Sequence, residues 1–431
     1  MSRRLFSLAG LLAISLLFAC GNGPSKPASS APRTSSVALS PTEISRFVWR
    51  TDIDRTLCPT APPIADASGN IYIPTWFRGP TYIGETYISG NSSQAIIVRV
   101  SPSGKANILE VPRLSPAREE IEELAWLKPP KGSEGGEGGL VALRESRRWS
   151  KYVSLTEAMS EEWTLPKNGH AILVGGHAIA MLDDGEDPIL SVWLKGHLLW
   201  RMRTGKGDII PSGASQLVYN GKDRLAVLTS GNSASVSVLT REGKLIFQAQ
   251  LERLERPVVQ VATMQFDAEG GLWVLGHATR YELVDNELHR VAKTSPHLMG
   301  DYVLDAWIAH YDKNGHRLLD KVFPAEYRMV LIGAAEHGGI LYSLLSTDGV
   351  MDPLDKRAGM QPPVFATYLV GLDKRGEIVY RAELDASRAA GGYIVPLPDG
   401  FFVMLVKRRY DKKRSSAYED CEGIRYLMQK R

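Results

Sequence analysis

The stretch Gln265-Phe266-Asp267-Ala268-Glu269-Gly270-Gly271-Leu272-Trp273-Val274 decides the fold. It places a tight turn between two short runs in which apolar and polar residues alternate, a pattern typical of half-buried strands. An Asp at the start of a turn accepts hydrogen bonds from backbone N–H groups further along, and Gly provides the positive φ that closes a hairpin. The stretch therefore predicts a β-hairpin in which Asp267 is a turn former.

The same unit returns along the chain. Its further copies share a strand-like run, a turn with Asp or a small polar residue before Gly, and a second run: Ile64–Ile73, Val98–Lys105, Val238–Ile246, Ala309–His316, Val370–Val379 and Val395–Val403. Regular recurrence indicates a repeat architecture in which each unit packs against the next. Pairing the hairpins predicts four-stranded sheets at 60–112, 118–166, 167–204, 211–252, 258–324, 328–386 and 391–431.

We therefore predict an all-β fold, a single β-propeller of seven four-stranded blades within residues 43–431. Six or eight blades remain open, because a glycine-rich stretch at 132–139 and insertions near 285–305 and 349–363 obscure the boundaries. An array of β-sandwiches is the alternative, although sandwiches do not need paired units at a regular spacing. The segments 66–72 and 267–274 resemble propellers of the broad class that includes NHL-repeat proteins, the SMP-30/gluconolactonase group and the propeller repeats of bacterial sensors.

Segments near the two ends of this region are expected to close the propeller. Phe47–Arg50 is strand-like but has no hairpin partner of its own, and Ile424–Met428 is similar, so we place both in the sheet of the last blade. Cys58 follows the first segment and Cys421 precedes the second. In an oxidising compartment such a pair is more often bridged than free, so we predict a disulfide, with two unpaired cysteines as the alternative.

The N-terminus has the form of an export signal. Arg3 and Arg4 precede the apolar run Leu5–Phe18, which is too short to span a bilayer, and Leu17-Phe18-Ala19-Cys20 follows. This sequence resembles the lipobox of bacterial lipoproteins. The resemblance implies a signal peptide at 1–19, acyl chains such as palmitate on Cys20, and anchoring in a Gram-negative envelope. Gly21, where an Asp would favour the inner membrane, implies the outer membrane. An ordinary signal peptide cut near Ala19 is the alternative.

Residues 20–42 are rich in Ser, Pro, Gly and Ala and almost free of large apolar side chains. Such a segment cannot build a core, and it is expected to be a flexible tether with a root-mean-square reach of roughly 25 Å. No later stretch has the roughly 18 apolar residues that a membrane helix needs. We therefore expect membrane attachment through the lipid on Cys20 alone.

Composition and motifs exclude several functions. Lys and Arg total 51 against 48 Asp and Glu, so nothing indicates a nucleic-acid partner. The chain has no Gly-x-Ser-x-Gly, His-Glu-x-x-His or phosphate-loop motif. Asp66, Asn70, Asp267 and Asp312 are of the residue types that hold calcium in lactonase propellers, but they lie in expected hairpin turns. We therefore predict no metal site and no cofactor.

Three further segments carry local signals. The acidic Glu119–Leu124 is interpreted as an amphipathic helical insertion between blades, with a docking edge as the alternative. The basic residues 407–409 and 412–414 are interpreted as a solvated hairpin on the rim, with anionic headgroups or an acidic partner as the alternative. Trp200 resembles the docking tryptophans of quinone-cofactor-like propellers, but the accompanying glycine of that family is not repeated here, so no cofactor follows.

These observations favour a binding function. We expect an outer-membrane lipoprotein whose propeller presents loops to another envelope protein or polymer. The rival hypothesis is a calcium-dependent propeller enzyme of the lactonase or hydrolase type. The two differ in whether acidic and amide side chains from several blades converge on the axis.

Overall fold

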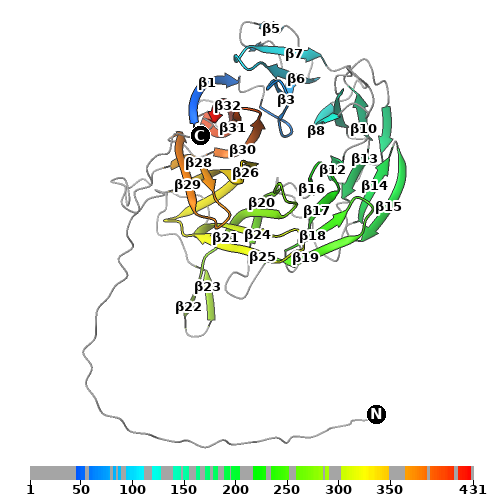
Figure 1. Ribbon diagram of the computed structural model, residues 1–431. Helices are drawn as coiled ribbons and strands as arrows, with labels where there is room; N and C mark the ends of the chain where they lie inside the picture. The colour runs from blue at the N-terminus through cyan, green and yellow to red at the C-terminus, as the bar shows by residue number, and fades with distance from the viewer. Residues whose placement is uncertain are drawn as a thin grey trace, which may run out of the picture. The chain divides into compact units, whose positions relative to one another are not determined.

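The computed structural model describes the chain from residue 45 to residue 428 with gaps (Figure 1). The described ranges are 45–53, 58–77, 81–83, 86–88, 94–110, 119–127, 139–146, 149–154, 162–165, 170–174, 178–182, 189–194, 196–203, 217–229, 234–251, 259–284, 287–290, 302–348, 365–385, 389–411 and 416–428. All belong to one unit, Pro41–Arg431. The expected signal peptide, Cys20 and the tether lie outside these ranges and stay predictions.

Strands make up all the regular structure of the described residues, and five of their sheets contain four strands each. In chain order these sheets are β2 (Ile64–Ala65), β3 (Ile71–Phe77), β6 (Gln94–Val100) and β7 (Ala106–Glu110); β8 (Glu119–Leu127), β9 (Gly139–Ser146), β10 (Trp149–Ser154) and β11 (Glu162–Leu165); β12 (His170–Leu173), β13 (Ala178–Leu182), β14 (Ile189–Leu194) and β15 (His197–Arg203); β16 (Leu217–Tyr219), β17 (Arg224–Thr229), β18 (Ser235–Thr240) and β19 (Leu245–Gln250); and β30 (Ala389–Leu397), β31 (Gly400–Asp411) and β32 (Ser416–Met428) with β1 (Ser45–Ile53).

An eight-stranded sheet consists of two antiparallel halves. Its strands are β20 (Val259–Phe266), β21 (Leu272–Thr279), β24 (Leu304–Tyr311) and β25 (Arg317–Phe323), then β26 (Arg328–His337), β27 (Ile340–Asp348), β28 (Phe365–Leu372) and β29 (Ile378–Asp385). One parallel bridge, Leu304 to Arg328, joins the halves. Two short hairpins, β4 (Thr81–Ile83) with β5 (Thr86–Ile88) and β22 (Tyr281–Val284) with β23 (Glu287–Arg290), follow the second strand of their sheets.

The result is an all-β, propeller-like arrangement (Figure 1). The last sheet takes its outermost strand from the start of the domain, because β1 pairs antiparallel with β32, from Ser45 beside Met428 to Ile53 beside Cys421. Closure by the two terminal segments is therefore confirmed.

The predicted disulfide is present in the structure. It links Cys58 to Cys421, whose Cα atoms are 5.5 Å apart, across 363 residues of sequence. In the chain-entropy account a closed loop of about 100 residues already contributes about 4.7 kcal/mol by restricting the unfolded chain. The bond joins the first sheet to the last and stabilises the closure.

The core lies between neighbouring sheets rather than inside one. One apolar cluster joins Val236, Val238 and Phe247 of β16–β19 to Val274 and Trp307 of the next sheet. Trp307 is fully buried, and burying a large apolar side chain contributes roughly 1.5–3 kcal/mol. Each sheet therefore depends on its neighbours for stability.

The edge strands β15, β19 and β25 repeat one contact. In each, the residue just after a β-bulge packs on the turn glycine of the following sheet, or of the following half of the eight-stranded sheet: Trp200 on Gly243, Phe247 on Gly315 and Leu319 on Gly376. All three glycines have positive φ, and a Cβ on them would lie 3.0, 2.5 and 2.6 Å from these side chains. The Trp200 Nε1 also donates to the Arg241 carbonyl at 2.8 Å. Trp200 therefore does have a glycine partner, supplied by the next sheet.

The expected helix at Glu119–Leu124 is wrong, because this segment is part of strand β8. The register shifts between Ile121 and Glu123, so a bulge inserts one extra residue. The bulge brings Ile121 and Leu124, which have helical spacing, to the same buried face. Of the basic run, residues 407–409 lie in β31, while 412–414 lie outside the described residues.

Candidate functional site

Turns with a side-chain acceptor at their first residue define one end of the sheets. The Asp312 Oδ1 accepts from the backbone N–H of Asn314 and His316 at 2.8 and 2.9 Å, and the Asp66 Oδ1 accepts from Ser68 and Asn70 at 2.9 Å. These contacts confirm that the repeated aspartates are turn formers. We call the end that carries the turns 220–224, 267–271, 312–316 and 373–377 the turn face.

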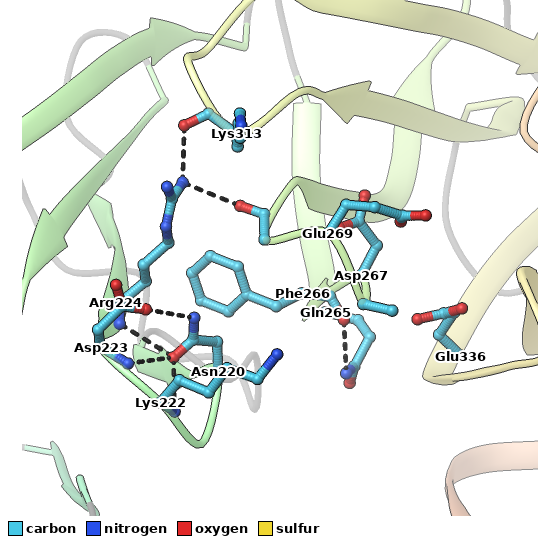
Figure 2. Close-up of a pocket in the computed structure, with 12 residues that line it drawn as sticks. Asn220, Lys222, Asp223, Arg224, Gln265, Phe266, Asp267, Glu269, Lys313 and Glu336 are labelled. Carbon is cyan, nitrogen blue, oxygen red and sulfur yellow. Dashed lines mark hydrogen bonds between the residues drawn. The ribbon is translucent and has the colours of Figure 1, made fainter.

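A hollow of about 460 Å³ opens on the turn face (Figure 2). Residues from the turns of two neighbouring sheets line it, together with one residue of β26. They are Asn220, Lys222, Asp223, Arg224, Gln265, Phe266, Asp267, Ala268, Glu269, Gly270, Lys313 and Glu336. Its size is in the range of sites that hold a small molecule or a short peptide.

The turn between β16 and β17 forms the first wall. The Asn220 Oδ1 accepts from the N–H groups of Lys222, Asp223 and Arg224 at 2.9 Å each, so this Asn replaces the Asp of the other turns. The Arg224 Nη1 donates to the Gly270 carbonyl at 3.1 Å and to the Lys313 carbonyl at 2.6 Å. Arg224 therefore fixes two turns of the following sheet against this wall.

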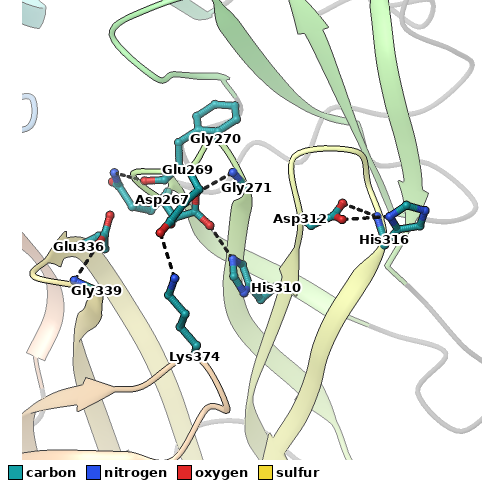
Figure 3. A network of polar contacts seen from close by, with 12 residues as sticks. Asp267, Glu269, Gly270, Gly271, His310, Asp312, His316, Glu336, Gly339 and Lys374 are labelled. Carbon is teal, nitrogen blue, oxygen red and sulfur yellow. Dashed lines mark hydrogen bonds and ion pairs between the residues drawn. The ribbon is translucent and has the colours of Figure 1, made fainter.

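The turn between β20 and β21 forms the second wall, and Asp267 ties it to the core (Figure 3). The Asp267 Oδ1 accepts from the Gly271 N–H at 2.6 Å, and its Oδ2 bonds the His310 Nε2 at 2.8 Å. His310 is only 3% exposed and stacks on Trp273, with ring centroids 3.8 Å apart. Burial by itself would raise the pKa of Asp267, but the hydrogen bonds from His310 and Gly271 outweigh it and lower the pKa below its ordinary value.

Two further carboxylates lie near Asp267, that of Glu269 in the same turn and that of Glu336 on the neighbouring strand β26 (Figure 3). The Glu269 Oε1 is 3.0 Å from the Lys374 Nζ of the next turn, and this ion pair raises the pKa of Lys374. The Glu336 Oε1 accepts from the Gly339 N–H at 3.0 Å. Both members of the Glu269–Lys374 pair are exposed, so the pair is weak and open to exchange.

The chemistry of the hollow is that of polar binding. Asp267 lines the hollow, but its partner His310 does not: His310 is buried, stacked on Trp273 and bonded to Asp267, so its ring does not face a substrate in the hollow. A general base must lie within reach of its substrate. Apart from Phe266 and Ala268, the side chains that line the hollow are ammonium, guanidinium, carboxylate and amide groups, which suit hydrogen bonds and ion pairs with a ligand.

The residues singled out in the sequence do not converge on one site. Cys58 and Cys421 lie in the closure, Asp66 bonds Asn70 and Tyr72 within its own turn, and Asp312 lies outside the hollow. Only Asp267 lines it. The part of the chain that the structure describes contains no group of three or more His, Cys, Asp or Glu that could hold a metal ion. It also contains no helix long and apolar enough to cross a membrane.

Sequence reasoning missed Asn220, Lys222, Arg224 and Glu336. A signal was available for the first three, because Asn220-Gly221-Lys222-Asp223 stands between two strand-like runs and Asn accepts the same turn hydrogen bonds as Asp. Nothing in the sequence indicates that Glu336, from β26, lies beside this turn.

Comparison with known proteins gives similarity at the level of the fold. No family model matches the chain, and no curated protein matches it. BamB from Moraxella catarrhalis is similar at a TM-score of 0.41 and 9% identity, over 90% of this chain and 99% of that one. Hydrazine synthase from Kuenenia stuttgartiensis gives 0.45 and 13%, over 86% and 97%. A quinohemoprotein alcohol dehydrogenase from Pseudomonas putida gives 0.40 and 10%, over 88% and 76%. No function is carried over from them.

Proposed function

We propose that this protein is an exported lipoprotein whose propeller binds another envelope protein or polymer. The observation that supports binding is the hollow on the turn face, where the available side chains are charged or amide groups and the Asp267–His310 pair is enclosed. We also infer seven blades, counting the five four-stranded sheets and the two halves of the eight-stranded sheet among the described residues.

The proposed location depends on the first 42 residues of the sequence. The arginines, the apolar run and Cys20 have the order of a lipoprotein signal, and the segment to residue 42 has the composition of a tether. In this proposal palmitate and further acyl chains on Cys20 anchor the protein in the outer membrane. Each buried CH₂ of an acyl chain contributes about 0.8 kcal/mol, so two or three chains hold the protein stably.

Replacement of the anchor residue tests the location. We expect Cys20→Ser to leave an uncleaved precursor or to release the protein from the membrane fraction, as fractionation and lipid labelling would show. Membrane protein that still incorporates labelled lipid after this change would refute the anchor.

Site-specific crosslinking in cells tests the binding function. A photoreactive amino acid at Ala268, an exposed residue of the hollow, should capture an envelope protein or polymer. Ala67 is a matched control, because it is exposed and holds the same position in the Asp66–Gly69 turn of the first sheet, away from the hollow. Equal capture at both positions, or none at Ala268, would contradict a binding role for this hollow.

A further inference from the structure

The two sides of the hollow carry opposite net charge. Lys222, Arg224 and Lys313 lie toward one side, where Asp223 accepts a hydrogen bond from the Asn220 side chain at 3.1 Å, and Asp267, Glu269 and Glu336 lie toward the other (Figure 2). The cations come from the turn between β16 and β17 and from Lys313 in the turn between β24 and β25, whereas the carboxylates come from the turn between β20 and β21 and from β26, so the separation of charge results from the way neighbouring sheets are placed. A ligand that spans the hollow therefore meets net positive charge at one end and carboxylates at the other.

Several of these groups are available to a ligand. Among the described residues, no hydrogen bond or ion pair engages the Nζ of Lys222 or Lys313, and both side chains are exposed. Glu336 accepts from the Gly339 N–H through one carboxylate oxygen. Glu269 pairs with the exposed Lys374, and Gln265 donates to the carbonyl of Phe266. By contrast, Asp267 and Arg224 are committed to the turns.

The mixed charge decides between ligand classes. A polyanion would meet the carboxylates of one wall and a polycation the ammonium groups of the other, so each would place like charges together. A short segment that carries both signs avoids this repulsion. A peptide has this chemistry, and its main-chain amides can also hydrogen-bond Gln265 in the floor of the hollow (Figure 2).

We infer that the hollow binds a bipolar peptide segment, with an acidic group against Lys222 and Lys313 and a basic group against Glu336 and Glu269. The inference rests on the proposed function, because it names the chemistry of the partner that this face would bind. It also sets the direction of the bound segment, since the two ends of the hollow differ in charge.

The test uses the full mature chain in detergent and a displayed library of random octapeptides. Enriched peptides should carry an acidic and a basic residue. We expect affinity to fall about five-fold for Lys222→Glu and less for Glu336→Gln, which keeps an acceptor for Gly339. Replacing the acidic residue of the peptide by Lys should restore binding to Lys222→Glu. Lys105→Glu is the matched control, because Lys105 is exposed in a turn of the first sheet, outside the hollow.

Three results would overturn the inference: no enrichment, enriched peptides of one charge sign, or bipolar peptides that bind Lys222→Glu as tightly as the wild type. If Ala268 still captures an envelope partner in cells, only the bipolar ligand is wrong. If Ala268 captures nothing, the proposed function itself fails. Circular dichroism of each variant separates a lost contact from a lost fold.

Discussion

The first Asp of each of two neighbouring turns of one sheet pairs with a His at nearly the same distance but in a different environment (Figure 3). Asp267 is 2.8 Å from His310, and Asp312 is 2.9 Å from His316. The side chain of His310 is 3% exposed, whereas that of His316 is 77% exposed. The N···O distance alone therefore does not assign a role to an Asp–His pair. The first pair joins a turn to the core, whereas the second lies on the surface of its turn.

The largest difference in stability is expected between variants that remove the imidazole of His310 and variants that remove that of His316. His310→Ala should lower the free energy of unfolding by about 4 kcal/mol, because it leaves a cavity beside Trp273 and removes a hydrogen bond from the partly buried Asp267. His316→Ala, on the surface, should change it by less than about 0.5 kcal/mol. Denaturant unfolding of both variants measures this, and similar losses would show that the two environments are equivalent.

A third histidine extends the comparison to pH. Burial lowers the pKa of His277 to about 4, and Arg328 adds to the effect. Between about pH 4 and about pH 6.5 the unfolded chain therefore binds a proton at His277 that the native protein does not bind. The contribution of the neutral His277 side chain to stability is thus complete above about pH 6.5 and is lost as the pH falls toward 4. The shift corresponds to about 3 kcal/mol. His277→Gln should flatten the dependence of stability on pH over this window, and an unchanged pH profile would contradict a neutral imidazole at this position.

Turns that pack against a neighbouring side chain should also tolerate alanine less well than turns that contact nothing. Gly315 and Gly221 both have positive φ, but a Cβ on Gly315 would lie 2.5 Å from Phe247, whereas one on Gly221 would meet nothing within 4 Å. Alanine at either position costs roughly 1–2 kcal/mol of backbone strain, and overpacking should add about 2 kcal/mol at Gly315 alone. Thermal unfolding of Gly315→Ala and Gly221→Ala compares them. Equal losses would mean that the contact with Phe247 contributes nothing.

The smallest effect on stability is expected at the exposed Asp312–His316 pair. The hydrogen bond from the His316 side chain, with those from the backbone of His316 and Asn314, lowers the pKa of Asp312 to about 2. A carboxylate with a lowered pKa stabilises the native state above about pH 4 and loses that contribution as the pH falls toward 2. NMR titration of wild type and His316→Ala should show the Asp312 pKa moving up toward its ordinary value. A pKa that stays near 2 would assign the shift to the backbone alone.

Much of the fold is predictable because hairpin chemistry is local. Asp267 and Gly270 lie in one turn, and their types report its geometry without reference to the rest of the chain. Ile121 and Leu124 show the limit of this reasoning, because a single bulge gives a strand the spacing of a helix. Pairing of β1 with β32 was predictable from a strand with no neighbour to pair with.

Contacts between sheets account for what was missed. Trp200 and Gly243 are distant in sequence and meet only because β15 lies beside the next turn. The hollow needs Lys222 and Glu336, from different sheets, beside the Asp267 turn. His310 was not singled out because its role depends on Trp273 stacking against it. The sequence around these side chains has no pattern that indicates their contacts, so their roles can be recognised only from the arrangement of the sheets.

The closure has a mechanical consequence for a chain held at its N-terminal end. In the proposed anchored form, a pull on the N-terminal segment reaches the described part of the domain at Ser45, where β1 begins beside Met428, so tension peels β1 from β32 starting at that end. Peeling can run to Ile53, beside Cys421, but the bond between Cys58 and Cys421 does not yield to such tension. The disulfide is thus a stop placed beyond the last pair of β1. Strand β1 can therefore detach and extend under tension while the disulfide keeps the remaining sheets assembled.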